Sequence, residues 1–194
     1  IGIDGNLYIK NQEPDGNRAL LTLENIPEGK KLIIEEGSTI SALSYTNESA
    51  ALNLVNNGSI IIVYGTNNND SIENNGYILN LIAKEGNDNI INNGTIRAIT
   101  SSGYGNDTII NNGTANQIFN GGGNDVIITH DADGNYTING ENAIKNSNNT
   151  FSVINNDNTF FKSYLSNGTL VSAIMFFGEN NSWQIDPTYL KEQI

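Results

Sequence analysis

Short apolar runs recur along the middle of the chain, and polar turn residues separate them. Between residues 59 and 128 the runs are four to six residues long, often alternate apolar with polar positions, and do not follow helical spacing. Gly and Asn fill the gaps between the runs, which is typical of tight turns. This pattern predicts an all-β chain of short strands without long helices.

Two turn motifs repeat with nearly the same interval. Asn-Asp turns place acids 18, 19 and 18 residues apart, at Asp70, Asp88, Asp107 and Asp125. Asn-Asn-Gly turns end at glycines spaced by 18, 18 and 19 residues, at Gly58, Gly76, Gly94 and Gly113. Both series absorb the same one-residue insertion, so each period is one physical coil. The sequence therefore predicts a parallel β-solenoid (β-roll or β-helix) with coils of about 18 residues, since a single coil cannot bury its apolar face alone.

The repeat also predicts a core and three segments of one continuous unit. Two inward columns are expected, one of Ile60, Ile78 and Ile96 and one of Ile72, Ile90, Ile109 and Ile127. Residues 1–51 are expected to form N-terminal strands and a cap, residues 52–150 the solenoid repeats, and residues 151–194 an aromatic-rich, hairpin-containing β cap. An irregular first coil is expected near residues 26–40. A further coil without an acid is expected at residues 139–144, where Ala143 stands in the acid's place.

Composition limits the function classes. The chain has 194 residues with a net charge of −12, 36 Asn and no Cys. Disulfides and thiolate zinc sites are therefore excluded. The negative charge disfavours nucleic acid as a partner, and the longest apolar stretch is too short for membrane insertion. The chain begins at Ile1, so we expect an excised fragment or a processed product.

The acidic column points to a cation. Acids repeated once per coil would stack at ~4.8 Å, and two carboxylates that close repel each other by ~1 kcal/mol even in water. A calcium ion takes oxygen ligands at ~2.3–2.6 Å and could bridge that gap. The alternative is ordinary Gly-Asn-Asp turn chemistry. For the Asn-Asn-Gly corner we expect ladders of side-chain amides without ions.

The turns at "GYGNDTII" and "NGGGNDVII" resemble the calcium-binding nonapeptide of the repeats-in-toxin (RTX) β-roll, Gly-Gly-x-Gly-x-Asp followed by an apolar strand. Asp70 departs from the pattern, because Asn68 stands where the family has Gly. The resemblance implies one row of calcium ions in a secreted or cell-surface bacterial protein. The implied metal-site residues are Asp70, Asp88, Asp107, Asp125, Gly86, Gly103, Gly105, Gly121 and Gly123.

These observations favour a calcium-stabilised structural or adhesive module, an adhesin-like part of a larger protein, with carbohydrate or a surface receptor as further partner. We expect no catalysis, because His130 is the single His and the four copies contain only Lys84 and Arg97 as basic residues. The alternatives are a polysaccharide-acting β-helix enzyme, such as a lyase or epimerase, and its non-catalytic carbohydrate-binding module. An ice-binding face is a third class, although Ser59, Tyr77, Thr95 and Thr114 form an irregular column.

Overall fold

The structure is a computed structural model. It describes residues 2–10, 19–24, 26–47, 50–100, 103–119, 121–145, 150–154, 161–165, 170–173, 175–177 and 183–185. These ranges contain strands and turns and no helix. The chain divides into two compact units, Ile1–Val126 and Ile127–Ile194, which are described separately.

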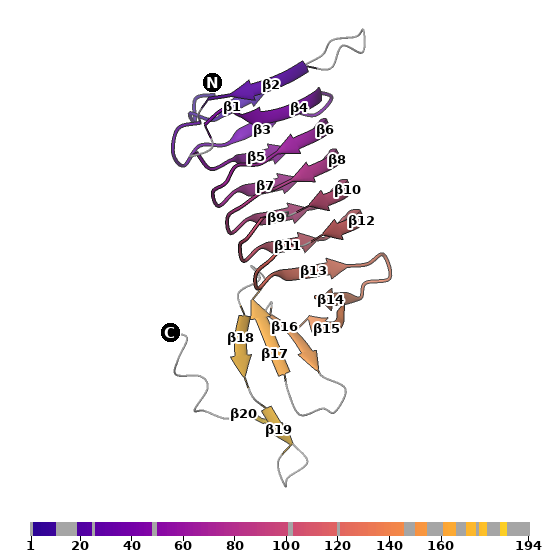
Figure 1. Cartoon of the computed structure of the whole chain (residues 1–194). Coiled ribbons are helices and arrows are strands. Elements are labelled where there is room, and N and C mark those ends of the chain that lie inside the picture. The colour runs from indigo at the N-terminus through magenta and orange to yellow at the C-terminus, as the bar shows by residue number, and fades with distance from the viewer. Residues whose placement is uncertain are drawn as a thin grey trace. The chain divides into compact units, whose positions relative to one another are not determined.

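The first unit is a stack of coils (Figure 1). Each coil contributes one strand to each of two parallel sheets. Sheet A has the order β1(Leu7–Ile9), β3(Leu32–Ile34), β5(Asn53–Asn56), β7(Ser71–Asn74), β9(Asn89–Asn92), β11(Thr108–Asn111). Sheet B has the order β2(Ala19–Leu23), β4(Thr39–Tyr45), β6(Ser59–Tyr64), β8(Tyr77–Ile82), β10(Thr95–Thr100), β12(Thr114–Phe119). Paired residues lie 18 residues apart from β6 to β8 and 19 apart from β10 to β12. The predicted all-β parallel solenoid is confirmed.

Aliphatic side chains fill the space between the two sheets in columns that run along the stack. Ile60, Ile78 and Ile96 are paired partners in sheet B and are fully buried. Ile72, Ile90 and Ile109 hold the same place in sheet A and are at most 1% exposed. Both columns were predicted, the second with Ile127 as a further member. Stacking buries each apolar face against the next coil and thereby supplies the main stabilising contribution.

The stack begins earlier than the sequence predicted. Residues 26–45 form a coil with strands β3 and β4, and β1 and β2 form another coil on its N-terminal side. The interval from Leu7 to its partner Leu32 is 25 residues. This long interval hides the first coil from a search for an 18-residue period.

The second unit changes from parallel to antiparallel pairing. Strands β13(Val126–His130), β14(Tyr136–Ile138), β15(Glu141–Lys145), β16(Thr150–Ile154), β17(Phe161–Leu165) and β18(Leu170–Ala173) form an antiparallel meander, and β19(Met175–Phe177) pairs with β20(Trp183–Ile185). The prediction of a further parallel coil at residues 139–144 is therefore wrong. In β13 the buried side chain is Ile128, whereas Ile127 is half-buried, so the predicted place of Ile127 in the inward column is wrong.

The predicted C-terminal hairpin is confirmed by the antiparallel pairing of β17 with β18. Its turn, residues 166–169, lies outside the described residues. Its role as a cap on the solenoid stays a prediction.

Candidate metal centre at the acidic corner

The four predicted acids occupy one corner of the stack, where each coil enters sheet A. Asp70, Asp88 and Asp107 are 2%, 2% and 3% exposed, and Asp125 is half-buried. Carboxylates that are so deeply buried need hydrogen-bond donors or a counter-charge to offset the loss of water.

Every acid accepts a hydrogen bond from a backbone amide of the neighbouring coil. The Oδ1 atom of each Asp accepts a hydrogen bond from the backbone N–H of the residue one coil toward the N-terminus. Leu52 donates to Asp70 at 2.7 Å, Asp70 to Asp88 at 2.9 Å, Asp88 to Asp107 at 2.9 Å, and Asp107 to Asp125 at 2.9 Å. The acids thus form a carboxylate–amide ladder that runs from coil to coil. The column of acids was predicted from the sequence, but these donors were not.

The asparagines immediately before the acids bind in the opposite direction. The side-chain oxygens of Asn69, Asn87 and Asn106 accept from the backbone N–H of the equivalent residue one coil toward the C-terminus, at 2.7–2.9 Å. Every Asn-Asp pair therefore binds one neighbouring coil through Asn and the other through Asp. The Asn of each Asn-Asp turn was visible in the repeat, but its direction was not.

The close approach of neighbouring coils explains two of the predicted glycines, Gly105 and Gly123. A Cβ atom on Gly105 would collide with the backbone oxygen of Gly86, and one on Gly123 with the backbone oxygen of Gly105. Gly103 donates to the backbone oxygen of Lys84 at 3.1 Å, and Gly121 is exposed. Steric contact alone thus requires glycine at positions 105 and 123.

Asp70 and Asp88 differ in the rest of their surroundings. Thr66 donates twice to Asp70, through its backbone N–H to Oδ2 and through Oγ1 to Oδ1, both at 2.7 Å. At the equivalent position before Asp88 stands Lys84, which has a φ of 73°. The Oδ2 atom of Asp88 is buried and has no hydrogen-bond partner.

Burial changes the acidity of these two carboxyl groups. The pKa of Asp88 is raised to about 7, mainly by loss of water; the Asp70 amide opposes this rise, and the charges of Asp70 and Asp107 add to it. Burial also raises the pKa of Asp70, although the hydrogen bonds from Thr66 and Leu52 oppose that rise. Asp88 is therefore the acid that most needs a proton or a cation.

The opposite corner is neutral and completes its own hydrogen bonds, as predicted for the Asn-Asn-Gly turns. Buried side-chain amides of the first Asn bind one another at 2.7–2.9 Å, along Asn56, Asn74, Asn92 and Asn111. A second, exposed ladder at 2.9–3.0 Å joins Asn57, Asn75, Asn93 and Asn112.

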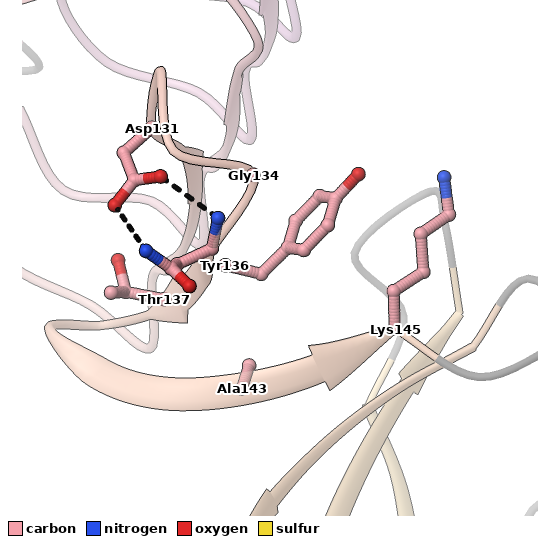
Figure 2. Close-up of a pocket in the computed structure, with 7 residues that line it drawn as sticks. Asp131, Gly134, Tyr136, Thr137, Ala143 and Lys145 are labelled. Carbon is pink, nitrogen blue, oxygen red and sulfur yellow. Dashed lines mark hydrogen bonds between the residues drawn. The ribbon is translucent and has the colours of Figure 1, made fainter.

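A separate pocket of about 750 Å³ lies in the second unit (Figure 2). Asp131 lines this pocket. Its carboxylate accepts hydrogen bonds from Asn135 N–H, Asn135 Nδ2 and Asp133 N–H, and these bonds hold the loop of residues 131–135 closed. The ring of Tyr136 stacks on His130 with ring centres 4.3 Å apart, and Lys145 Nζ lies 5.5 Å from the centre of the Tyr136 ring. The interpretation of this loop as a solvated turn fits these contacts.

Across the described ranges, no three His, Asp or Glu side chains are grouped closely enough to hold a metal ion. Calcium at the acidic corner would therefore need backbone carbonyl oxygens besides one or two carboxylates. Comparisons with protein-family models, curated proteins and solved structures each found no match to this chain. In the part of the chain that is described, no helix has the length and hydrophobicity needed to cross a membrane.

Proposed function

We propose that this chain is a calcium-stabilised structural or adhesive module of a secreted or cell-surface bacterial protein, related to the RTX β-roll. The rigid element is the first unit, in which side-chain ladders at both corners hold successive coils together. In adhesion, the solenoid would present a carbohydrate- or receptor-binding part of the protein at a distance from the surface. The role requires no catalysis.

The single observation that supports calcium is the unpartnered oxygen of Asp88. Oδ2 is a hard, acceptor-only ligand in a buried position between two further acids, which is the ligand type that calcium prefers. Asp88 would hold the ion, together with backbone carbonyl oxygens of its corner. Asp70 has less need of an ion, because Thr66 and Leu52 already occupy its carboxylate.

A proton competes with calcium for Asp88, and this competition defines the test. With a pKa of about 7, the carboxyl is charged at pH 8 and protonated at pH 5. We expect millimolar-range calcium, matched to weak extracellular sites of about 10⁻⁴–10⁻³ M affinity, to raise the melting temperature at pH 8 and to have little effect at pH 5. The control is Asp88→Asn, whose melting temperature calcium should not raise at either pH.

Equal melting temperatures in EDTA and in calcium at pH 8 would contradict the calcium proposal. An equal rise with magnesium, or a rise that persists in Asp88→Asn, would assign the effect to general screening of the −12 net charge.

A further inference from the structure

The outer face of sheet B is free of carboxylates in a strongly acidic protein. None of the residues in β4, β6, β8, β10 and β12 is Asp or Glu, and Arg97 is their only charged residue. Sheet A differs, because Glu73 stands on its outer face in β7 and Glu35 and Glu36 directly follow β3.

The centre of the sheet B face is apolar. The inward positions of β6 are Ile60 and Val63, so Ile61 and Ile62 between them are only half-buried. The same pattern in β8 leaves Leu79 half-buried, and Ile82 follows it on the same strand. Toward the C-terminal edge Arg97, Asn116 and Gln117 make the face more polar, and Phe119 at the end of β12 is 53% exposed. An apolar centre beside a polar margin is typical of an interaction surface.

We propose that this face binds a second copy of the chain in a two-fold symmetric dimer. Two copies that each carry a charge of −12 repel each other, and a face without carboxylates is where they can approach at the lowest electrostatic cost. The aliphatic side chains suit another sheet with the same strand spacing, as in aligned sheet-on-sheet packing. A sugar ligand would instead require exposed aromatic rings at the centre, where Tyr64 of β6 and Tyr77 of β8 are half-buried.

The size of the face sets the strength of the dimer. Five strands spaced ~4.8 Å apart, with six residues at ~3.3 Å each, cover about 24 by 20 Å, or about 960 Å² for the two copies together. This area lies near the lower limit of about 1,000 Å² for specific interfaces. The dimer is therefore weak, and its population depends on concentration.

A two-fold axis between β6 and β8 gives the contact a defined register. The axis lies in the interface and runs parallel to the strands, so it reverses strand order and keeps strand direction, and β6 of one copy faces β8 of the other. Ile60 and Ile78 are paired partners, so the residues that follow them, Ile61 and Leu79, lie at the same height, and Ile61 of each copy faces Leu79 of the other. Both contacts bury aliphatic carbon, and the polar residues of β10 and β12 lie at the margin.

Charged substitutions on the full chain test this arrangement. Analytical ultracentrifugation of the wild-type chain over a hundredfold concentration range should show a mass that rises toward twice the 21.0 kDa of one chain. Ile61→Lys and Leu79→Glu should each be monomeric. A mixture of the two should recover the dimer, because each mixed pair gains one Lys–Glu contact and keeps one Ile–Leu contact. Ile91→Lys, at a half-buried outward position of sheet A, is the matched control and should still dimerise.

Circular dichroism checks that every variant folds, and Ile61→Ser with Leu79→Ser replaces any charged variant that does not. A wild-type chain that is monomeric at all concentrations would overturn the proposal. So would single variants that dimerise like the wild type, or an Ile91→Lys control that is equally monomeric. Failure of the mixture to recover would overturn the register between β6 and β8. None of these outcomes depends on calcium.

Discussion

Each coil of the first unit turns at two corners. At both corners buried polar side chains join successive coils by hydrogen bonds, but the side chains differ. At the Asn-Asn-Gly corner, a buried amide such as Asn92 both donates to the next coil and accepts from the previous one, at 2.7 and 2.9 Å. At the Asn-Asp corner, a buried carboxylate such as Asp88 can only accept, and one of its oxygens has no partner. The difference lies in donor capacity. An amide column is complete in itself, whereas a carboxylate column needs a donor, a proton or a cation from elsewhere.

The largest effect on stability is expected from Asn92→Asp, which places an acid in the buried amide ladder of the Asn-Asn-Gly corner. Asn92 Nδ2 donates to Asn111 Oδ1 and to the Thr114 backbone oxygen, and a carboxylate would place charge against both acceptors. We expect a loss of about 3–5 kcal/mol in the free energy of unfolding at pH 8, measured by urea denaturation. Asn93→Asp, one residue further in the exposed ladder, is the control and should lose less than about 1 kcal/mol. Similar losses for both variants would mean that burial does not separate the two ladders.

The next effect concerns pH. The folded-state pKa of Asp88 is about 7 and lies above the unfolded value of about 3.9, so the native state binds more protons between these values. The contribution of Asp88 to stability is therefore full at pH 4, falls as the pH rises to about 7 and is flat above, with a total change on the order of 2–4 kcal/mol. The raised pKa of Asp70 acts in the same direction.

Asp88→Asn isolates the contribution of Asp88 to the pH dependence of stability. The substitution replaces the carboxyl group by a neutral amide, as at the Asn-Asn-Gly corner. Without calcium, the variant should be more stable than the wild type at pH 8 and similar to it at pH 4. Denaturation curves at a series of pH values measure the slope. A wild-type slope that survives in the variant would assign the pH dependence to other groups.

Thr66→Val makes Asp70 more like Asp88. The substitution keeps the shape of the side chain and removes the hydroxyl, which donates to Asp70 and accepts from Asn68 N–H at 3.2 Å. We expect a loss of about 1–2 kcal/mol, together with a steeper loss of stability with rising pH. Thr66→Ser, which keeps the hydroxyl, is the control. An equal loss in both variants would trace the effect to the methyl group.

The smallest effect is expected at Lys84, which stands in the place of Thr66 one coil later. Its φ of 73° lies in the left-handed region, where a non-glycine residue is strained. Lys84→Gly should stabilise the protein by about 0.5–1 kcal/mol. Glu85→Gly, the neighbouring exposed position, should instead destabilise it slightly, and thermal melting compares the two. Destabilisation by Lys84→Gly would show that the lysine side chain contributes more than its backbone strain costs.

Sequence periodicity predicted the coils, the two isoleucine columns and the amide ladders, because each depends on side chains at fixed intervals. It missed the donors to the carboxylates, because backbone amides carry no residue-specific signal. Thr66 carried only a weak sequence signal, because it occurs in a single copy of the repeat. The false coil at residues 139–144 arose because its spacing matched the repeat. There the local chemistry of Asp131, which accepts from Asp133 and Asn135 N–H, closes a tight loop and reverses the chain into an antiparallel strand.

The direction of the carboxylate–amide ladder has a consequence for how the protein is made. The acid that accepts from the Asp88 amide is Asp107, which lies 19 residues later in the chain. A chain that emerges from its N-terminus therefore leaves the corner amide of its newest coil unsatisfied until the next coil arrives. Growth of the stack proceeds in whole-coil steps, and each step completes the step before it. The side chains of this one corner thus give the stack a direction, since each coil is completed by the coil that follows it in the chain.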